Sequence, residues 1–153
     1  MRRRLGAAVI GLGVGEQHAR TLTHLPECEL RWVFDIDSSR ARRIGPELGA
    51  QVASRYDEIL SDPAVDLVSI ASYDDAHFEQ VVAALEAGKH VFVEKPLCRT
   101  TAELRRIKRL ITETGRHLAS NLVLREVPLY TWLRAAIRDG RLGEIYAFDG
   151  DYL

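Results

Sequence analysis

The sequence is poor in cysteine and carries almost no net charge, and each shortage excludes a class of protein. Its two cysteines, Cys28 and Cys98, form neither a CxxC motif nor a His/Cys cluster at metal-ligand spacing. We therefore expect a protein of the reducing cytoplasm that has no structural metal. The formal net charge of -1 indicates no nucleic-acid partner and no acidic membrane surface.

Long apolar runs are also missing. Arg2, Arg3 and Arg4 precede an apolar stretch that stops at Ile10 and runs into glycines, with no small-residue cleavage site. This pattern is neither a signal peptide nor a membrane anchor, so we expect no membrane partner. The 46% hydrophobic content, in 153 residues without repeats or low-complexity segments, is enough for one domain with a sizeable core.

Strands and helices are expected to alternate along the first 121 residues. Most of the expected strands are continuous apolar runs, which is typical of strands buried in a parallel sheet. Right-handed crossovers through the helices then give an α/β fold with a doubly wound parallel sheet of the Rossmann type. We expect strands at residues 5–10, 30–35, 51–54, 66–71, 90–93 and 117–121, and helices at residues 16–24, 39–48, 57–60, 75–87 and 101–114.

The organisation changes after Asn121. Residues 128–139 have the pattern of one more amphipathic helix, and residues 144–148 have that of a strand. Such a strand has no partner in the five residues that follow it, and an unpaired strand is unstable. We therefore expect a dinucleotide-binding domain at residues 1–121, followed at 122–153 by a crossing helix and the first strand of a truncated C-terminal α/β domain.

The first expected strand runs straight into a glycine loop formed by Gly11, Leu12, Gly13, Val14 and Gly15. A dinucleotide-binding βαβ unit starts in this way. The backbone N–H groups of Gly13, Val14 and Gly15 are expected to face the pyrophosphate at a helix N-terminus, because glycine permits close approach. Leu12 is expected to line the adenosine side.

Asp35 follows Gly11 by 24 residues, at the end of the second expected strand. A carboxylate there can accept both hydroxyls of an adenosine ribose and repels a 2'-phosphate, which favours NAD(H) over NADP(H) as the cofactor. The alternative is that Asp35 or Asp37 only caps the helix that starts near Ser39, a role that suits Asp37 better.

Two further segments follow expected strands of the same sheet. The turn that contains Ala71, Ser72 and Tyr73 can pack against a ribose of the cofactor, and His77 either touches the cofactor or caps the next helix and packs. Glu94-Lys95-Pro96 places an acid and an amine at the carboxyl end of a buried strand. Open α/β sheets carry their chemistry at this edge.

Together these residues resemble the glucose-fructose oxidoreductase / inositol dehydrogenase (Gfo/Idh/MocA) family. The resemblance covers nearly the whole chain: Gly-Leu-Gly with nearby His18, Asp35, the turn at 71–77, the block at 84–96 that ends in Glu-Lys-Pro, and residues 140–145. The sequence departs from the family pattern in two places. Its loop is one residue short, with Glu16 at the third glycine's place, and Tyr73 stands where the family has proline.

The resemblance implies an NAD(P)-dependent dehydrogenase of sugars, cyclitols or related polyols, with an N-terminal Rossmann domain and a C-terminal α/β domain. By resemblance Lys95 is the catalytic lysine, which stabilises the alkoxide that develops as hydride leaves the substrate carbon. Glu94 orients Lys95 or contacts the nicotinamide ribose, and Asn121 and Arg125 are candidate substrate contacts. A lysine at the surface without a catalytic role is the plain alternative for Lys95.

The family's acid/base histidine belongs to the C-terminal domain, so we expect these 153 residues to bind cofactor but to be inactive alone. We expect a homo-oligomer to form through that domain. The main alternative is a non-catalytic dinucleotide-binding regulator or sensor, which the short glycine loop favours, since a fold does not fix a function. A third alternative is a subunit completed by another chain or by self-association.

Overall fold

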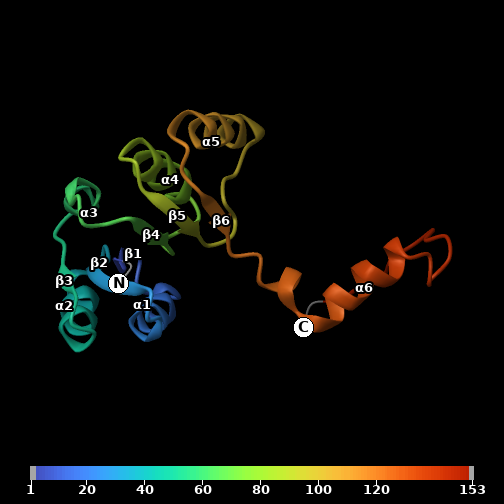
Figure 1. The fold of residues 1–153 in the computed structure, drawn as a ribbon, viewed down its shortest axis with the longest axis horizontal. Helices are drawn as coiled ribbons and strands as arrows, with labels where there is room; N and C mark the ends of the chain where they lie inside the picture. The colour runs from blue at the N-terminus through green and yellow to red at the C-terminus, as the bar shows by residue number, and fades with distance from the viewer. Residues whose placement is uncertain (1–2, 152–153) are drawn as a thin grey trace. The chain divides into compact units, whose positions relative to one another are not determined.

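The protein forms a six-stranded parallel sheet in the order β3-β2-β1-β4-β5-β6, seen in a computed structural model that describes residues 3–151 (Figure 1). The doubly wound α/β fold expected from the sequence is confirmed. The strand order reverses between β1 and β4, so ligands are expected at the carboxyl edge of the sheet near these two strands. The strands are β1 (Leu5–Ile10), β2 (Cys28–Phe34), β3 (Gln51–Val52), β4 (Leu67–Ile70), β5 (His90–Val93) and β6 (Leu118–Ser120).

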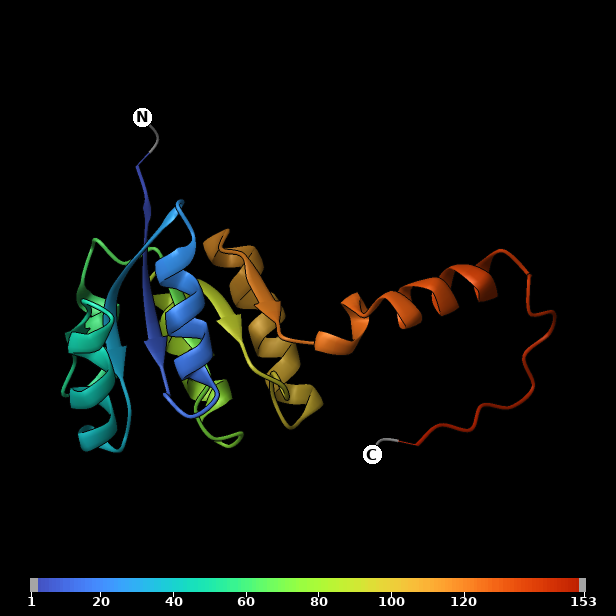
Figure 2. The same ribbon diagram turned by 90° about the horizontal axis from the view of Figure 1, so that it is seen from below.

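Helices cover both faces of this sheet (Figures 1 and 2). Because neighbouring residues of a strand point to opposite faces, β1 contributes Ala7 and Val9 to one core and Ala8 and Ile10 to the other. The core of Ala7 and Val9 is shared with α1 (Gly15–His24) and α2 (Ser38–Glu47). The opposite core is shared with α3 (Tyr56–Ser61), α4 (His77–Glu86) and α5 (Thr101–Thr114).

A second unit begins at Leu122, after the compact unit of residues 1–121. It contains a 3-10 turn, η1 (Val123–Glu126), and the helix α6 (Pro128–Arg138), which starts where the sequence predicts and ends one residue earlier. Residues 144–148, where the first strand of a truncated second domain is expected, are in neither a helix nor a strand here. A strand needs a neighbour to accept its backbone hydrogen bonds, and none is paired with this segment in the described part of the chain.

No helix within residues 3–151 has both the length and the apolar character needed to span a bilayer.

Candidate functional site

The glycine loop between β1 and α1 contains glycines with three different spatial roles. Gly11 has a φ of +86°, and a Cβ there would lie 2.5 Å from the carbonyl oxygen of Ala71, so only glycine fits this turn. A Cβ on Gly15 would lie 3.0 Å from the Ala71 Cβ and 3.1 Å from Val9 Cγ1. A Cβ on Gly13 would meet nothing within 4 Å, so the space outside the loop is open there.

These roles change which residue is assigned to the place of the third glycine. In a dinucleotide-binding fingerprint the third glycine allows close packing of helix against strand. Gly15 fills that role here, although the sequence pattern assigns the place to Glu16. The helix α1 accordingly begins at Gly15, one residue before the predicted start, and Glu16 instead forms an ion pair with Arg20 at 2.7 Å.

The N-terminus of α1 presents unused hydrogen-bond donors. Among the described residues, the backbone N–H groups of Gly13, Val14 and Gly15 donate to no protein acceptor. Such donors at the positive end of a helix dipole form a site for an anionic group. The side chain of Leu12, predicted to line the adenosine side, is 1% exposed and packs in the core shared with α1 and α2.

Asp35 directly follows β2 and is almost completely buried. Its Oδ2 accepts hydrogen bonds from the Leu12 N–H at 2.6 Å and from Arg40 Nη1 at 3.3 Å, and its Oδ1 accepts one from the Asp37 N–H at 2.7 Å. A carboxylate oxygen accepts about two hydrogen bonds. Oδ1 therefore retains one acceptor place that no protein donor occupies, while Arg40 takes the second place on Oδ2.

Asp37, and not Asp35, caps α2. Its Oδ1 accepts hydrogen bonds from the backbone N–H groups of Ser39 at 3.0 Å and Arg40 at 3.4 Å. A hydrogen bond from the Ser39 side chain, together with those two, holds the pKa of Asp37 below its ordinary value.

His77 bridges two loops at the carboxyl edge of the sheet. The side chain is fully buried, with Nδ1 2.7 Å from the Pro96 carbonyl oxygen and Nε2 3.1 Å from the Ser72 carbonyl oxygen. The structure therefore favours the packing alternative for His77, which holds the turn after β4 against the segment after Lys95. Ala71 is also buried, whereas the Tyr73 side chain projects into solvent.

Glu94, directly after β5, is the acceptor in a network of three donors. Its Oε1 accepts hydrogen bonds from His18 Nε2 at 3.1 Å and from Asn121 Nδ2 at 2.6 Å, and its Oε2 accepts one from the Lys95 N–H at 3.2 Å. Burial alone would raise the pKa of Glu94. The hydrogen bonds from Asn121 and Lys95 and the charge of His18 outweigh this, so the pKa is lowered overall and Glu94 is ionised at neutral pH.

Lys95 is exposed at the carboxyl edge of the sheet. Asn121, a candidate substrate contact by sequence, turns its amide to Glu94 instead. Arg125 lies in η1, where its carbonyl oxygen accepts hydrogen bonds from Thr131 and Arg134. The roles of Ser69 and Arg40 are not predictable from the sequence, because no local pattern marks either residue as a partner of His18 or Asp35.

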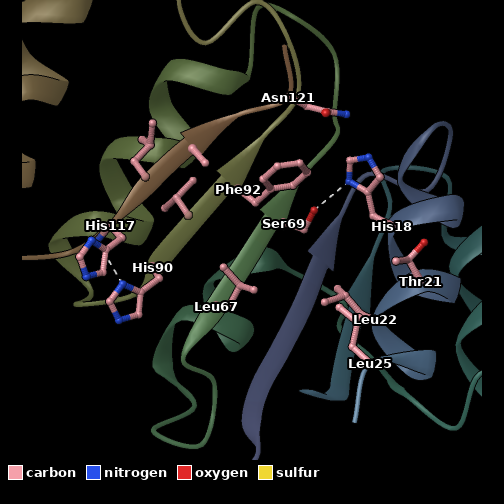
Figure 3. A pocket seen from close by; sticks show the side chains of 13 residues that line it. His18, Thr21, Leu22, Leu25, Leu67, Ser69, His90, Phe92, His117 and Asn121 are labelled. Carbon is pink, nitrogen blue, oxygen red and sulfur yellow. Dashed lines mark hydrogen bonds between the residues drawn. The ribbon is translucent and has the colours of Figure 1, made fainter. Parts of the chain in front are cut away.

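An apolar cavity of about 530 Å³ lies on the sheet face beside α1 (Figure 3). His18, Ser69 and Asn121 line one end of it, and His90 and His117 line the other. The two latter rings are stacked, with centroids 5.2 Å apart, and the His117 N–H donates to His90 Nδ1. Burial, with the charges of Arg116 and His117, lowers the pKa of His90. The other lining residues are Thr21, Leu22, Leu25, Leu67, Val91, Phe92, Leu118 and Ala119.

Within residues 3–151 no group of three or more His, Cys, Asp or Glu side chains is placed to hold a metal ion.

Comparison with known proteins agrees with this geometry. Residues 5–122 match the family model described as the oxidoreductase family with an NAD-binding Rossmann fold, GFO_IDH_MocA. The scyllo-inositol 2-dehydrogenase (NAD(+)) of Bacillus subtilis (strain 168) is 33% identical over 153 residues, which cover 98% of this chain and 45% of that protein. An inositol 2-dehydrogenase of Pseudomonas fluorescens is 37% identical, over 92% of this chain and 43% of its own length.

Among solved structures, GenD2 from gentamicin A biosynthesis, determined in complex with NAD, superimposes with a TM-score of 0.86 at 33% identity. The match covers 92% of this chain and 41% of GenD2. This chain thus spans less than half the length of these relatives. It belongs to the Gfo/Idh/MocA family of oxidoreductases and forms an NAD-binding Rossmann domain of that family.

Proposed function

We propose that this chain is the cofactor-binding part of an NAD(H)-dependent oxidoreductase that interconverts a secondary alcohol of a sugar or polyol and the corresponding ketone. One observation carries the proposal: the glycine loop, Asp35 and Lys95 end three different strands at the same edge of the sheet, next to the point where the strand order reverses. The inositol dehydrogenases among the relatives support the substrate class.

The residues at this edge fit a dinucleotide. The free N–H groups of Gly13, Val14 and Gly15 provide donors for a pyrophosphate, and the open space at Gly13 lets it approach. Asp35 provides an acceptor for a ribose hydroxyl and a negative charge that disfavours a 2'-phosphate. These features support NAD(H) over NADP(H).

Lys95 supplies the charge that the reaction requires. When bound, the cofactor supplies a nicotinamide ring that exchanges hydride with the substrate carbon. The Lys95 ammonium donates a hydrogen bond to the substrate oxygen and stabilises the negative charge that grows there as the C–H bond breaks. Glu94 holds the backbone N–H of Lys95 and thereby fixes the start of the segment that carries the ammonium.

The alternative of a non-catalytic regulator depended on the short glycine loop. The short loop was the reason to expect altered cofactor binding, and Gly15 keeps the close contact of α1 with Val9 and Ala71. A cytoplasmic location also belongs to this proposal, supported by the free thiols of Cys28 and Cys98. A homo-oligomer that forms through the second domain typical of the family is also part of this proposal.

Calorimetric titration of the 153-residue chain with NADH and with NADPH tests the cofactor assignment. We expect the chain to bind NADH and to prefer it over NADPH by ~1–3 kcal/mol, the scale of a buried polar group left without a partner. Absence of NADH binding would reject the proposal, and equal affinities for the two dinucleotides would reject the ribose role of Asp35.

A further inference from the structure

His18 links the helix of the dinucleotide loop to the segment of Lys95. It lies in the first turn of α1, and its ring bonds to β4 on one side and to the end of β5 on the other: Nδ1 lies 2.9 Å from Ser69 Oγ and Nε2 lies 3.1 Å from Glu94 Oε1. Figure 3 shows the ring directed from α1 toward Ser69, with Asn121 beyond it.

The hydrogen-bond roles in this network follow from the charge of Glu94. An ionised carboxylate only accepts hydrogen bonds, so Nε2 of His18 is the donor to Glu94. When the ring is neutral, Nδ1 accepts a hydrogen bond from the Ser69 hydroxyl; when the ring is protonated, Nδ1 donates to Ser69 Oγ. The ring also packs against Phe92, with centroids 5.5 Å apart, and the His18 side chain is only 13% exposed. Its orientation is therefore fixed by three neighbours.

Glu94 connects His18 to the backbone of Lys95. One carboxylate oxygen is held by His18 and Asn121, and the other accepts the backbone N–H of Lys95. The free N–H groups that suit a pyrophosphate lie at the start of α1, three to five residues before His18. Any shift of this helix end moves Nε2 relative to Glu94, and a charged hydrogen bond depends strongly on that geometry.

We propose that His18 is a positioning residue that couples occupancy of the dinucleotide loop to the placement of Lys95. An anionic group at the N-terminus of α1 fixes the first turn of the helix, His18 then holds Glu94, and Glu94 holds the Lys95 backbone. This role rests on the proposed function, because it matters only where the loop binds a dinucleotide and Lys95 acts on the substrate. Asn121, the residue after β6, holds the same carboxylate without a contact through α1.

Amide hydrogen exchange of the 153-residue chain measures this coupling directly, because the Lys95 N–H is itself a donor in the network. We expect saturating NADH to slow exchange at Lys95 by about tenfold, the scale of one stabilised hydrogen bond to a charged group. In His18→Ala this response should fall below about twofold, while the Kd for NADH stays within about threefold of the unsubstituted chain. His18→Gln, whose amide still donates toward Glu94, should restore most of the response.

Two control variants separate coupling from general stability. His24→Ala removes an exposed histidine of the same helix and should respond to NADH like the unsubstituted chain. Asn121→Ala should speed exchange at Lys95 with and without NADH but should keep the NADH response, because α1 still reaches Glu94. It also provides the comparison should His18→Ala not fold.

Two results would overturn the positioning role while the proposed function stands. In one, His18→Ala binds NADH, and NADH slows exchange at Lys95 as strongly as in the unsubstituted chain. In the other, His18→Ala loses NADH affinity by more than about tenfold, which would make His18 part of the cofactor site itself. Failure of the unsubstituted chain to bind NADH would overturn the proposed function and the positioning role with it.

Discussion

The carboxylate of Asp35 accepts the backbone N–H of Leu12 at 2.6 Å and so joins the end of β2 to the glycine loop. The acid that the sequence predicts to be a ribose ligand thus also holds the glycine loop in place. Because the two roles share one buried side chain, changes at Asp35 are expected to alter cofactor selectivity and stability together.

Asp35→Asn should reduce the preference for NADH. The variant keeps an oxygen that can accept the Leu12 N–H but loses the negative charge and releases Arg40, which can then approach a 2'-phosphate. We expect the ratio of NADPH to NADH affinity, measured by calorimetry, to rise by about tenfold. An unchanged ratio would show that Asp35 does not select the cofactor.

Asp37→Ala is the matched control for this experiment. It removes the N-cap of α2, two residues further along the chain, and should cost about 1 kcal/mol in the free energy of unfolding. The ratio of NADPH to NADH affinity should stay the same, since the Asp37 side chain binds only the helix end and alanine keeps the backbone N–H that donates to Asp35.

Gly13 and Gly15 should respond in opposite ways to a larger side chain. Gly13→Val places its side chain in open space, so the chain should fold with an unchanged free energy of unfolding but lose NADH binding, because the pyrophosphate can no longer approach. Gly15→Val pushes α1 away from Val9 and should cost ~1–3 kcal/mol of stability. Denaturant unfolding and calorimetry distinguish the two, and normal NADH binding by Gly13→Val would make the loop purely structural.

The ionised Glu94 carboxylate should make the free energy of unfolding depend on pH in the acid range. Since the pKa of Glu94 is lower in the folded protein than its ordinary value, its contribution is complete above the unfolded-state pKa and is lost as the pH falls through the folded-state pKa. The free energy of unfolding of Glu94→Gln should therefore fall less between pH 5 and acid pH than that of the unsubstituted chain. Parallel curves would contradict this assignment; Glu113→Gln, on an exposed part of α5, serves as the control.

The sequence predicts those features that depend on local patterns. The apolar runs of β1 and β5 locate the strands, and the residues after them fall at the functional edge because parallel strands share that edge. The bond from His18 to Glu94 spans 76 residues of sequence, and only packing of α1 on the sheet brings the two together. The same packing gives Gly15 its role and buries Leu12, which a pattern of glycines does not reveal.

The predicted ends of strands were less accurate where pairing decides them. β2 begins at Cys28, two residues earlier than predicted, because Cys28 and Glu29 pair with Leu5 and Gly6 of β1. The segment at 144–148 shows the opposite case, since its alternation predicts a strand and no neighbour pairs with it. The hydrophobic pattern of a segment indicates its tendency to form a strand, and the neighbouring strand decides how many of its residues pair.

Lys95→Ala should separate binding from chemistry, in an assay of a full-length protein that contains the remainder of the substrate site. If the ammonium stabilises the developing alkoxide, the substitution should lower turnover by about 100-fold or more, the usual cost of losing one preorganised charge donor, and leave NADH affinity nearly unchanged. Lys95→Arg should not rescue turnover, because a guanidinium is planar and larger and cannot present a compact charge at the same point. Lys108→Ala, at an exposed lysine of α5, is the control and should be fully active. Turnover of Lys95→Ala within a few-fold of the parent would mean that this lysine shapes the cleft without taking part in hydride transfer.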